Sequence, residues 1–84
     1  MPTISIVGLG KLGASMVAAY ADRGFSVIGV DINEQAVAAI NEKRSPVPEA
    51  QVTELLQKNA AGVRATTDVR EAVLWSDFTF VIVP

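Results

Sequence analysis

The chain has 84 residues, no cysteine, no histidine, and a formal net charge of −2 from seven basic and nine acidic side chains. These counts exclude disulfides, thiol nucleophiles and imidazole or thiolate metal ligands, and we expect no metal site. The evenly spread charge predicts no nucleic-acid or membrane partner, and the length allows one small domain, residues 1–84.

The N-terminus gives no sign of a targeting segment. Met1-Pro2-Thr3 has no basic flank, and the apolar run behind it is only a few residues long. A signal peptide needs both features, and a membrane-spanning helix needs about 20 apolar residues. We therefore expect a cytoplasmic location.

A strand from Thr3 to Val7 is expected first, because its mostly apolar residues suit a central parallel strand. A Gly-x-Gly-x-x-Gly motif follows at once. Gly8 allows the tight turn out of the strand, Gly10 allows a pyrophosphate to approach the backbone, and Gly13 allows close packing of the next helix on the sheet. This setting is typical of a dinucleotide-binding loop.

A helix is expected from Lys11 to Arg23, with a stop signal at Gly24. Its amino-terminal N–H groups favour an anion. Lys11 lies near the expected pyrophosphate, although a solvated side chain is the simpler interpretation, and Leu12 contributes its N–H and a place against the sheet. The predicted apolar stripe is Leu12, Met16 and Ala19, and the small residues Ala14, Ala18 and Ala21 should let the helix lie close to the sheet.

A second strand, Phe25–Val30, places Asp31 at its carboxyl end, where open α/β sheets bind ligands. A carboxylate there accepts hydrogen bonds from both ribose hydroxyls and repels a 2′-phosphate, which predicts NAD rather than NADP. Asp31 has an alternative interpretation as a residue that precedes or caps the helix beginning near Asn33.

The rest of the chain predicts two more strands and three more helices. A proline loop, Ser45-Pro46-Val47-Pro48, separates the first two of these helices, and Asp68 with Glu71 resembles a capping box. Right-handed crossovers then give an α/β fold, half of a Rossmann domain, whose parallel sheet of about four strands has the order 3-2-1-4 with helices on both faces. The elements are helices Asn33–Arg44 and Glu49–Ala61, strand Val63–Thr66, a helix burying Val69, Ala72 and Val73, and strand Phe78–Val83.

Several segments are more distinctive than the glycine motif. They are Ile4–Gly10, Val27–Ile32, Ser45-Pro46-Val47 with Glu49, Leu55-Leu56, Arg64–Asp68 and Val81–Pro84. Through these segments the whole chain resembles the amino-terminal, NAD-binding part of the UDP-glucose/GDP-mannose dehydrogenase family. It departs from the family at Lys11 and Leu12, where tyrosine and valine are usual, and at Ala36, where a basic residue is common.

The resemblance implies a function for the chain. Members of that family oxidise the C6 alcohol of a nucleotide sugar to a carboxylate in two NAD-dependent steps, through a thioester on a cysteine of a later domain. This chain has no cysteine, so we expect no catalytic residue in it and a nucleotide-sugar substrate only in the complete protein. The implied role is binding the adenosine-pyrophosphate end of NAD, through Gly8, Gly10, Lys11, Leu12, Gly13 and Asp31.

Three alternatives remain at this point, and the simplest is a folded half-domain that binds nothing because the nicotinamide half of the site is absent. The 3-hydroxyisobutyrate and 6-phosphogluconate dehydrogenases also open with a Gly-Leu-Gly motif, but are expected to connect strands two and three differently. A non-catalytic module that senses NAD or an adenine nucleotide fits the lack of catalytic groups equally well. In each case the last strand leaves an open sheet edge, which predicts self-association.

Overall fold

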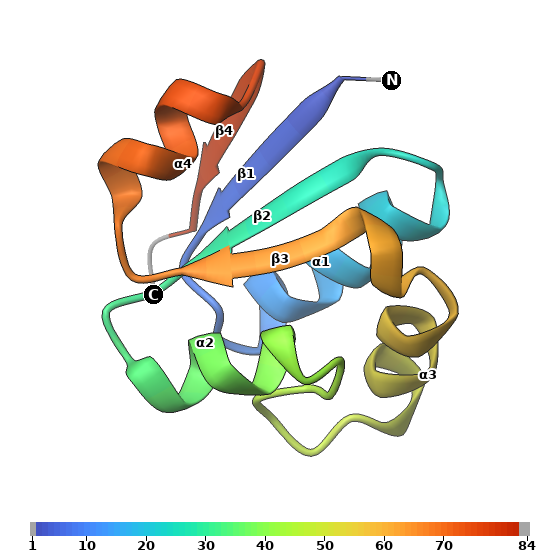
Figure 1. Ribbon diagram of the computed structural model, residues 1–84. Coiled ribbons are helices and arrows are strands. Elements are labelled where there is room, and N and C mark those ends of the chain that lie inside the picture. The colour runs from blue at the N-terminus through green and yellow to red at the C-terminus, as the bar shows by residue number, and fades with distance from the viewer. Residues whose placement is uncertain (1, 83–84) are drawn as a thin grey trace.

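Strands and helices alternate along the chain in the computed structural model, which describes residues 2–82 (Figure 1). The strands are β1 (Thr3–Val7), β2 (Ser26–Val30), β3 (Val63–Thr66) and β4 (Phe78–Val81). The helices are α1 (Lys11–Asp22), α2 (Glu34–Asn41), α3 (Ala50–Lys58) and α4 (Val69–Trp75), and a 3-10 turn, η1, covers Ala60–Gly62. Within the described residues, no helix has both the length and the apolar character needed to cross a membrane.

The strands form one parallel sheet in the order β3-β2-β1-β4, which confirms the predicted order. Ile4 of β1 pairs with Val27 of β2 on one side and with Phe78 of β4 on the other. Because all strands run in the same direction, their carboxyl ends meet at one end of the sheet, where this class of fold binds ligands.

The face of the sheet covered by α1, α2 and α3 holds the main core, and we call it the closed face (Figure 1). The predicted apolar stripe of α1 is wrong: Leu12 and Ala19 are exposed and Met16 is only partly buried. The prediction for the small residues is confirmed, since Ala14, Ala18 and Ala21 are buried on the side of the helix that packs on the sheet. The buried residues of this core are Ile4, Ile6, Leu9, Ala14, Val17, Ala18, Ala21, Val27, Ala36, Val37, Ile40, Val52, Leu56 and Val63.

Among residues 2–82, α4 is the one element that covers the opposite face, and we call this the open face (Figure 1). Its core consists of Ile28, Val30 and Ala72. The prediction that α4 also buries Val69 and Val73 is wrong, since both are exposed. No further element among residues 2–82 lies over the outer side of α4, so its apolar side chains have nothing to pack against.

One buried polar residue joins β1 to the open side. The Ser5 hydroxyl is fully buried and lies 2.8 Å from Oγ1 of Thr79 and 2.9 Å from Oγ of Ser76. These bonds satisfy a hydroxyl that would otherwise be costly to bury. They attach the middle of β1 to β4 and to the residue that follows α4.

Helices α1 and α2 end earlier than predicted, and the local backbone explains both ends. Helix α1 ends at Asp22, and the Phe25 N–H still donates to the Tyr20 carbonyl at 3.2 Å, so β2 begins only at Ser26. Helix α2 ends at Asn41 rather than at Arg44. Lys43 has a φ of 61° there, in the left-handed region that stops a helix.

Strands β1 and β3 have the predicted bounds, whereas α3, the start of α2 and β4 differ by a few residues. Asn33 is the cap of α2 and Glu34 is its first residue, since the Asn33 side chain accepts hydrogen bonds from the N–H groups of Gln35 and Ala36. Helix α3 covers only Ala50–Lys58 of the predicted range, and η1 takes up its end. Strand β4 ends at Val81, and the predicted end at Val83 lies outside the described residues.

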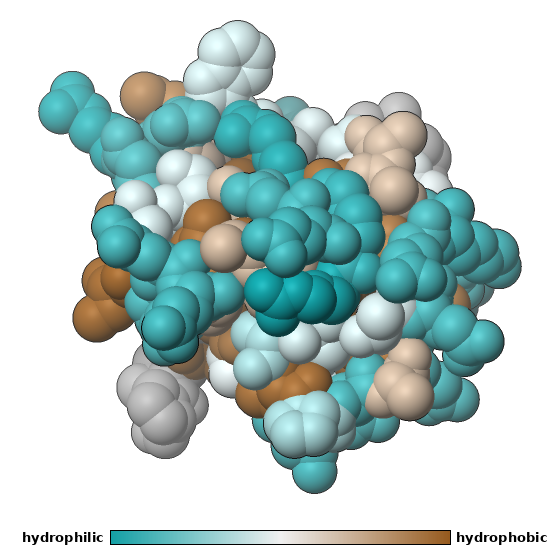
Figure 2. Space-filling model, turned by 60° about the horizontal axis from the view of Figure 1, so that its bottom comes forward, coloured by the Kyte–Doolittle hydropathy of each residue, from teal (hydrophilic) through white to brown (hydrophobic). Residues whose placement is uncertain are grey.

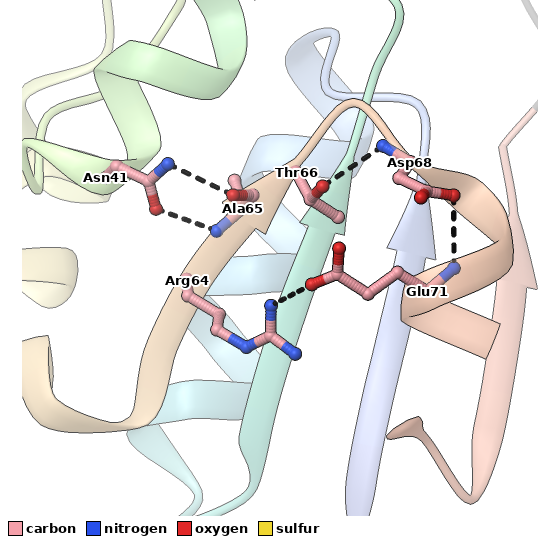
Figure 3. Close-up of polar contacts among 6 residues, drawn as sticks. All are labelled: Asn41, Arg64, Ala65, Thr66, Asp68 and Glu71. Atoms are coloured by element: carbon pink, nitrogen blue, oxygen red, sulfur yellow. Dashed lines mark hydrogen bonds and ion pairs between the residues drawn. The ribbon is translucent and has the colours of Figure 1, made fainter. Parts of the chain in front are cut away.

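The outer edge of β3 is closed by a side chain that imitates a neighbouring strand (Figure 3). The Asn41 amide donates to the Ala65 carbonyl at 3.0 Å and accepts from the Ala65 N–H at 2.8 Å. The Lys43 ammonium donates to the Val63 carbonyl on the same edge. Backbone groups that would be free to pair with another strand are therefore satisfied within the chain.

The segment after β3 is held by its own polar side chains (Figure 3). Asp68 caps α4 by accepting from the Glu71 N–H at 3.1 Å, while its own N–H donates to Thr66 Oγ1 at 3.0 Å. Only half of the predicted capping box forms, because the Glu71 carboxylate instead pairs with Arg64 at 3.0 Å. The distinctive segment Arg64–Asp68 thus fixes the turn between β3 and α4 with its own side chains.

Candidate functional site

A groove of about 780 Å³ lies at the carboxyl ends of the central strands. It is formed where the turn after β1, the start of α1, the end of β2 and the residue after β4 meet. All six predicted site residues line this groove. Its lining is Val7, Gly8, Gly10, Lys11, Leu12, Gly13, Asp31, Ile32 and Ile82.

Gly8 makes the turn out of β1. Its φ of +107° is a backbone conformation that residues with a side chain rarely adopt. Its N–H donates to the Val30 carbonyl at 2.7 Å, and a Cβ added here would lie 2.8 Å from the Ile82 carbonyl oxygen. Only glycine therefore lets the chain turn between the ends of β2 and β4.

Gly13 and Gly10 differ in what surrounds them. A Cβ added at Gly13 would lie 1.7 Å from the Gly8 carbonyl oxygen, so the first turn of α1 rests directly on the turn after β1. The sequence predicted that Gly13 allows close packing on the sheet. The closest approach is instead to the turn after β1, since the nearest atom of β1, in Ile6, would lie 3.7 Å from the added Cβ. A Cβ added at Gly10 would meet nothing within 4 Å. Gly10 thus leaves space in the groove rather than fitting against the protein.

The amino terminus of α1 opens into the groove with its amides free for a ligand. Ala14 is the first residue whose N–H bonds back along the chain, to the Gly10 carbonyl at 2.9 Å. Within the described residues, no side chain caps this end of the helix. The preceding N–H groups and the helix dipole together favour an anion.

Lys11 and Leu12 occupy the first turn of α1, and both side chains are exposed. The prediction that Leu12 lies against the sheet is wrong, since 60% of its surface is accessible. The Leu12 side chain lines the groove, and its backbone forms part of the first turn of α1. Lys11 adds one positive charge at the same end of the groove.

The Asp31 carboxylate faces the glycine loop from the end of β2. Oδ2 accepts a hydrogen bond from the Leu9 N–H at 2.8 Å, and Oδ1 accepts one from the Asn33 N–H at 2.9 Å. The alternative interpretation of Asp31 is thus partly correct, because it does organise the turn before α2. The cap of α2 itself is Asn33.

Three apolar residues of the groove were not predicted as part of a site: Val7, Ile32 and Ile82. Ile32 is the most informative, since 94% of its surface is exposed directly beside Asp31. An isoleucine so exposed at the end of a buried strand is unusual for a position that only packs. The sequence signal was an apolar residue immediately after the acidic one.

The donor set of this groove fits a dinucleotide. Free amides at the start of α1 suit a pyrophosphate, a carboxylate at the end of β2 suits hydroxyl donors, and Ile32 offers an apolar surface to a flat ring. The space at Gly10 is where a phosphate can approach the backbone closely.

Comparison with known proteins agrees with this geometry. Residues 2–84 match the NAD binding domain of the UDP-glucose/GDP-mannose dehydrogenase family. The chain belongs to this family. NAD is accordingly its cofactor, and the match favours this family over the 3-hydroxyisobutyrate and 6-phosphogluconate dehydrogenases.

Individual relatives of this family cover nearly the whole chain. A GDP-mannose 6-dehydrogenase of Pseudomonas syringae is 42% identical over 82 residues, which are 95% of this chain and 19% of that protein. A UDP-glucose 6-dehydrogenase of Haloferax volcanii is 39% identical over 82 residues, 96% of this chain and 19% of the relative. The chain therefore spans about a fifth of the length of the dehydrogenases it matches.

Solved structures give the same result. A ternary complex of GDP-mannose dehydrogenase from Pseudomonas aeruginosa superimposes with a TM-score of 0.91 at 40% identity, covering 96% of this chain and 19% of that one. A UDP-glucose dehydrogenase from Pyrobaculum islandicum gives a TM-score of 0.90 at 28% identity, covering 99% and 20%. The family and the fold thus agree.

Proposed function

We propose that this chain binds the adenosine-pyrophosphate end of NAD within a nucleotide-sugar 6-dehydrogenase. One observation carries the proposal: the uncapped start of α1 and the Asp31 carboxylate line the same groove. Backbone N–H groups that donate to an anion and a carboxylate that accepts from hydroxyl groups lie in one groove. They match the two polar parts of an adenosine diphosphate, the pyrophosphate and the ribose.

The residues divide between the parts of the cofactor. Backbone amides around Gly10, Lys11 and Leu12 bind the pyrophosphate, and Lys11 adds attraction for its charge. Asp31 accepts hydrogen bonds from the ribose hydroxyls with the lone pairs that the protein leaves unused. Ile32 contacts the adenine ring.

The complete enzyme is proposed to oxidise the C6 alcohol of a UDP- or GDP-linked sugar to a carboxylate. Bound NAD supplies the hydride acceptor for this oxidation. The chain itself has no cysteine or histidine to attack the substrate or accept its proton. Its own part is to bind the cofactor and to fix where the cofactor lies.

Calorimetric titration of the chain with NAD and with NADP tests this role. We expect weak binding of NAD and weaker binding of NADP, because a 2′-phosphate meets the like charge of Asp31. Asp31→Ala should narrow the ratio between the two affinities. Equal binding of NAD and NADP by the unsubstituted chain would show that the role given to Asp31 is wrong.

We also propose that two copies associate through the free edge of β4. The edge of β3 is closed by Asn41, whereas β4 has an exposed backbone edge and exposed side chains on both faces, among them Phe78 and Val81. A strand edge with apolar side chains favours pairing with another strand.

Sedimentation tests the association. We expect a dimer whose population rises with concentration and falls in Val81→Lys, because a lysine on an edge strand opposes pairing. Gln51→Lys, on the exposed side of α3, adds the same charge elsewhere and should leave the dimer unchanged. A strictly monomeric chain at high concentration would contradict the proposal.

A further inference from the structure

Leu9 is the residue between the first two glycines of the loop, and its side chain anchors the loop to the sheet. Only 2% of its surface is exposed. A Cβ added at Gly29 of β2 would lie 3.0 Å and 3.3 Å from the two terminal methyl groups of Leu9. Leu9 therefore sits on the space that Gly29 leaves by having no side chain.

The backbone of the same residue is held by Asp31. The Leu9 N–H donates to Asp31 Oδ2 at 2.8 Å in a part-buried setting, across 22 residues of sequence. The other carboxylate oxygen, Oδ1, accepts from the Asn33 N–H at 2.9 Å. One ionised side chain thus connects the glycine loop to the turn that begins α2.

We propose that Asp31 is a positioning residue that holds the glycine loop in its phosphate-binding shape before any ligand is present. A loop that is already ordered loses less conformational entropy when it binds, so its affinity is higher. The inference rests on the proposed function, in which this loop binds pyrophosphate. It adds that Asp31 acts on the phosphate end of the cofactor as well as on the ribose.

The chemistry of the two hydrogen bonds requires a carboxylate. Both partners of Asp31 are N–H donors, so both of its oxygens must accept. An asparagine of the same shape has one oxygen and one NH₂ group, and its NH₂ would face an N–H donor. Asp31→Asn can therefore satisfy only one of the two amides, although its size is unchanged.

The first test needs no ligand. Hydrogen exchange of the Leu9 amide, followed by NMR, should be about tenfold or more faster in Asp31→Asn than in the unsubstituted chain. Glu34→Gln removes the same charge from an exposed position on α2 and is the matched control. Unchanged exchange at Leu9 in folded Asp31→Asn would overturn the proposal.

The second test uses inorganic pyrophosphate, which has no ribose. If Asp31 acted on the ribose alone, Asp31→Asn would leave pyrophosphate affinity unchanged or raise it, since a negative charge near an anion is removed. If Asp31 holds the loop, the affinity should fall by about tenfold. The two roles therefore predict opposite directions, and an equal or higher affinity would overturn the positioning role.

A further variant covers the case in which Asp31→Asn does not fold. Asp31→Glu keeps the charge but moves the carboxylate by one methylene, so exchange at Leu9 should still become faster. If the unsubstituted chain binds neither NAD nor pyrophosphate, this result would contradict the proposed function. The exchange rate of Leu9 would then still decide whether Asp31 holds the loop.

Discussion

The closed and open faces of the sheet bury very different amounts of apolar surface. Three helices and a continuous core cover the closed face, whereas α4 and the small cluster of Ile28, Val30 and Ala72 cover the open one. The outer surface of α2 and α3, which points away from the sheet, is mostly hydrophilic (Figure 2). On the open face and along β4, large apolar side chains remain exposed, including Leu74, Trp75 and Phe78.

This difference separates two properties of the chain. Hydrophobic burial is the main favourable contribution to folding, so the stability of the chain should depend mainly on the closed face. Exposed apolar patches of this kind mark interaction surfaces, so contacts with other protein chains should depend on the open face and β4. The predictions below test this separation.

The largest effect is expected at Gly13, where α1 meets the turn after β1. Gly13→Ala places a Cβ 1.7 Å from the Gly8 carbonyl oxygen. The backbone must move to relieve this overlap. We expect the free energy of unfolding, measured with urea, to fall by more than about 4 kcal/mol, which is enough to unfold so short a chain. A stable Gly13→Ala protein would show that α1 does not lie so close.

Gly10→Ala is the matched control. A Cβ there meets no atom within 4 Å, and the φ of −74° suits alanine. The unfolding free energy should change by less than about 1 kcal/mol. NAD binding in calorimetry should nevertheless weaken, because the added methyl group occupies the space proposed for the pyrophosphate.

A second prediction compares the same substitution on the two faces. Leu56 on the closed face has 0% of its surface exposed, and Leu74 on α4 has 75% exposed. Leu56→Ala should lower the unfolding free energy by about 2–5 kcal/mol, because it leaves a cavity. Leu74→Ala should change it by no more than about 0.5 kcal/mol. Similar losses in urea unfolding for both variants would contradict the separation of the faces.

The smallest effect concerns Asp22, at the outer rim of the closed side. A hydrogen bond from Asn59, and then the ammonium of Lys58 at 3.2 Å, lower the pKa of the Asp22 carboxyl below its usual value. Because the folded pKa is the lower one, this contribution to stability is present above the unfolded pKa and is lost as the pH falls through the folded pKa.

The unsubstituted chain should therefore have a slightly higher urea midpoint than Asp22→Asn at neutral pH, and the two midpoints should converge in acid. The difference should also shrink at high salt, because the pair is exposed. A difference that stays constant from neutral pH into acid would mean that the Asp22 charge does not contribute.

The strands and their order could be predicted because each strand is an apolar run and the crossover rule leaves few arrangements. Burial on the helices could not be predicted as well. Leu12 continues an apolar pattern yet is exposed, and Val73 is exposed because nothing in the described chain lies over α4. Periodicity identifies an apolar side of a helix but not whether another element covers it.

The groove was partly predictable for a similar reason. The glycine spacing and Asp31 point to one place because strand ends meet there. The bond between Asp31 and the Leu9 N–H has no signal in the sequence, since it depends on the shape of a loop 22 residues away. Ile32 lies beyond the predicted strand and was not predicted as a site residue, and its exposure in the structure marks it as part of the groove.

The pair of hydrogen bonds between Asn41 and Ala65 has a consequence for stoichiometry. A sheet with two free edges can add neighbours at both ends and grow into a filament, whereas a sheet with one free edge can join only one partner. With β3 closed by Asn41 and Lys43, the strand pairing proposed for β4 would use the same edge of both copies and end at two. Asn41 and Lys43 together would thus limit the proposed edge-to-edge assembly of this sheet to a closed dimer.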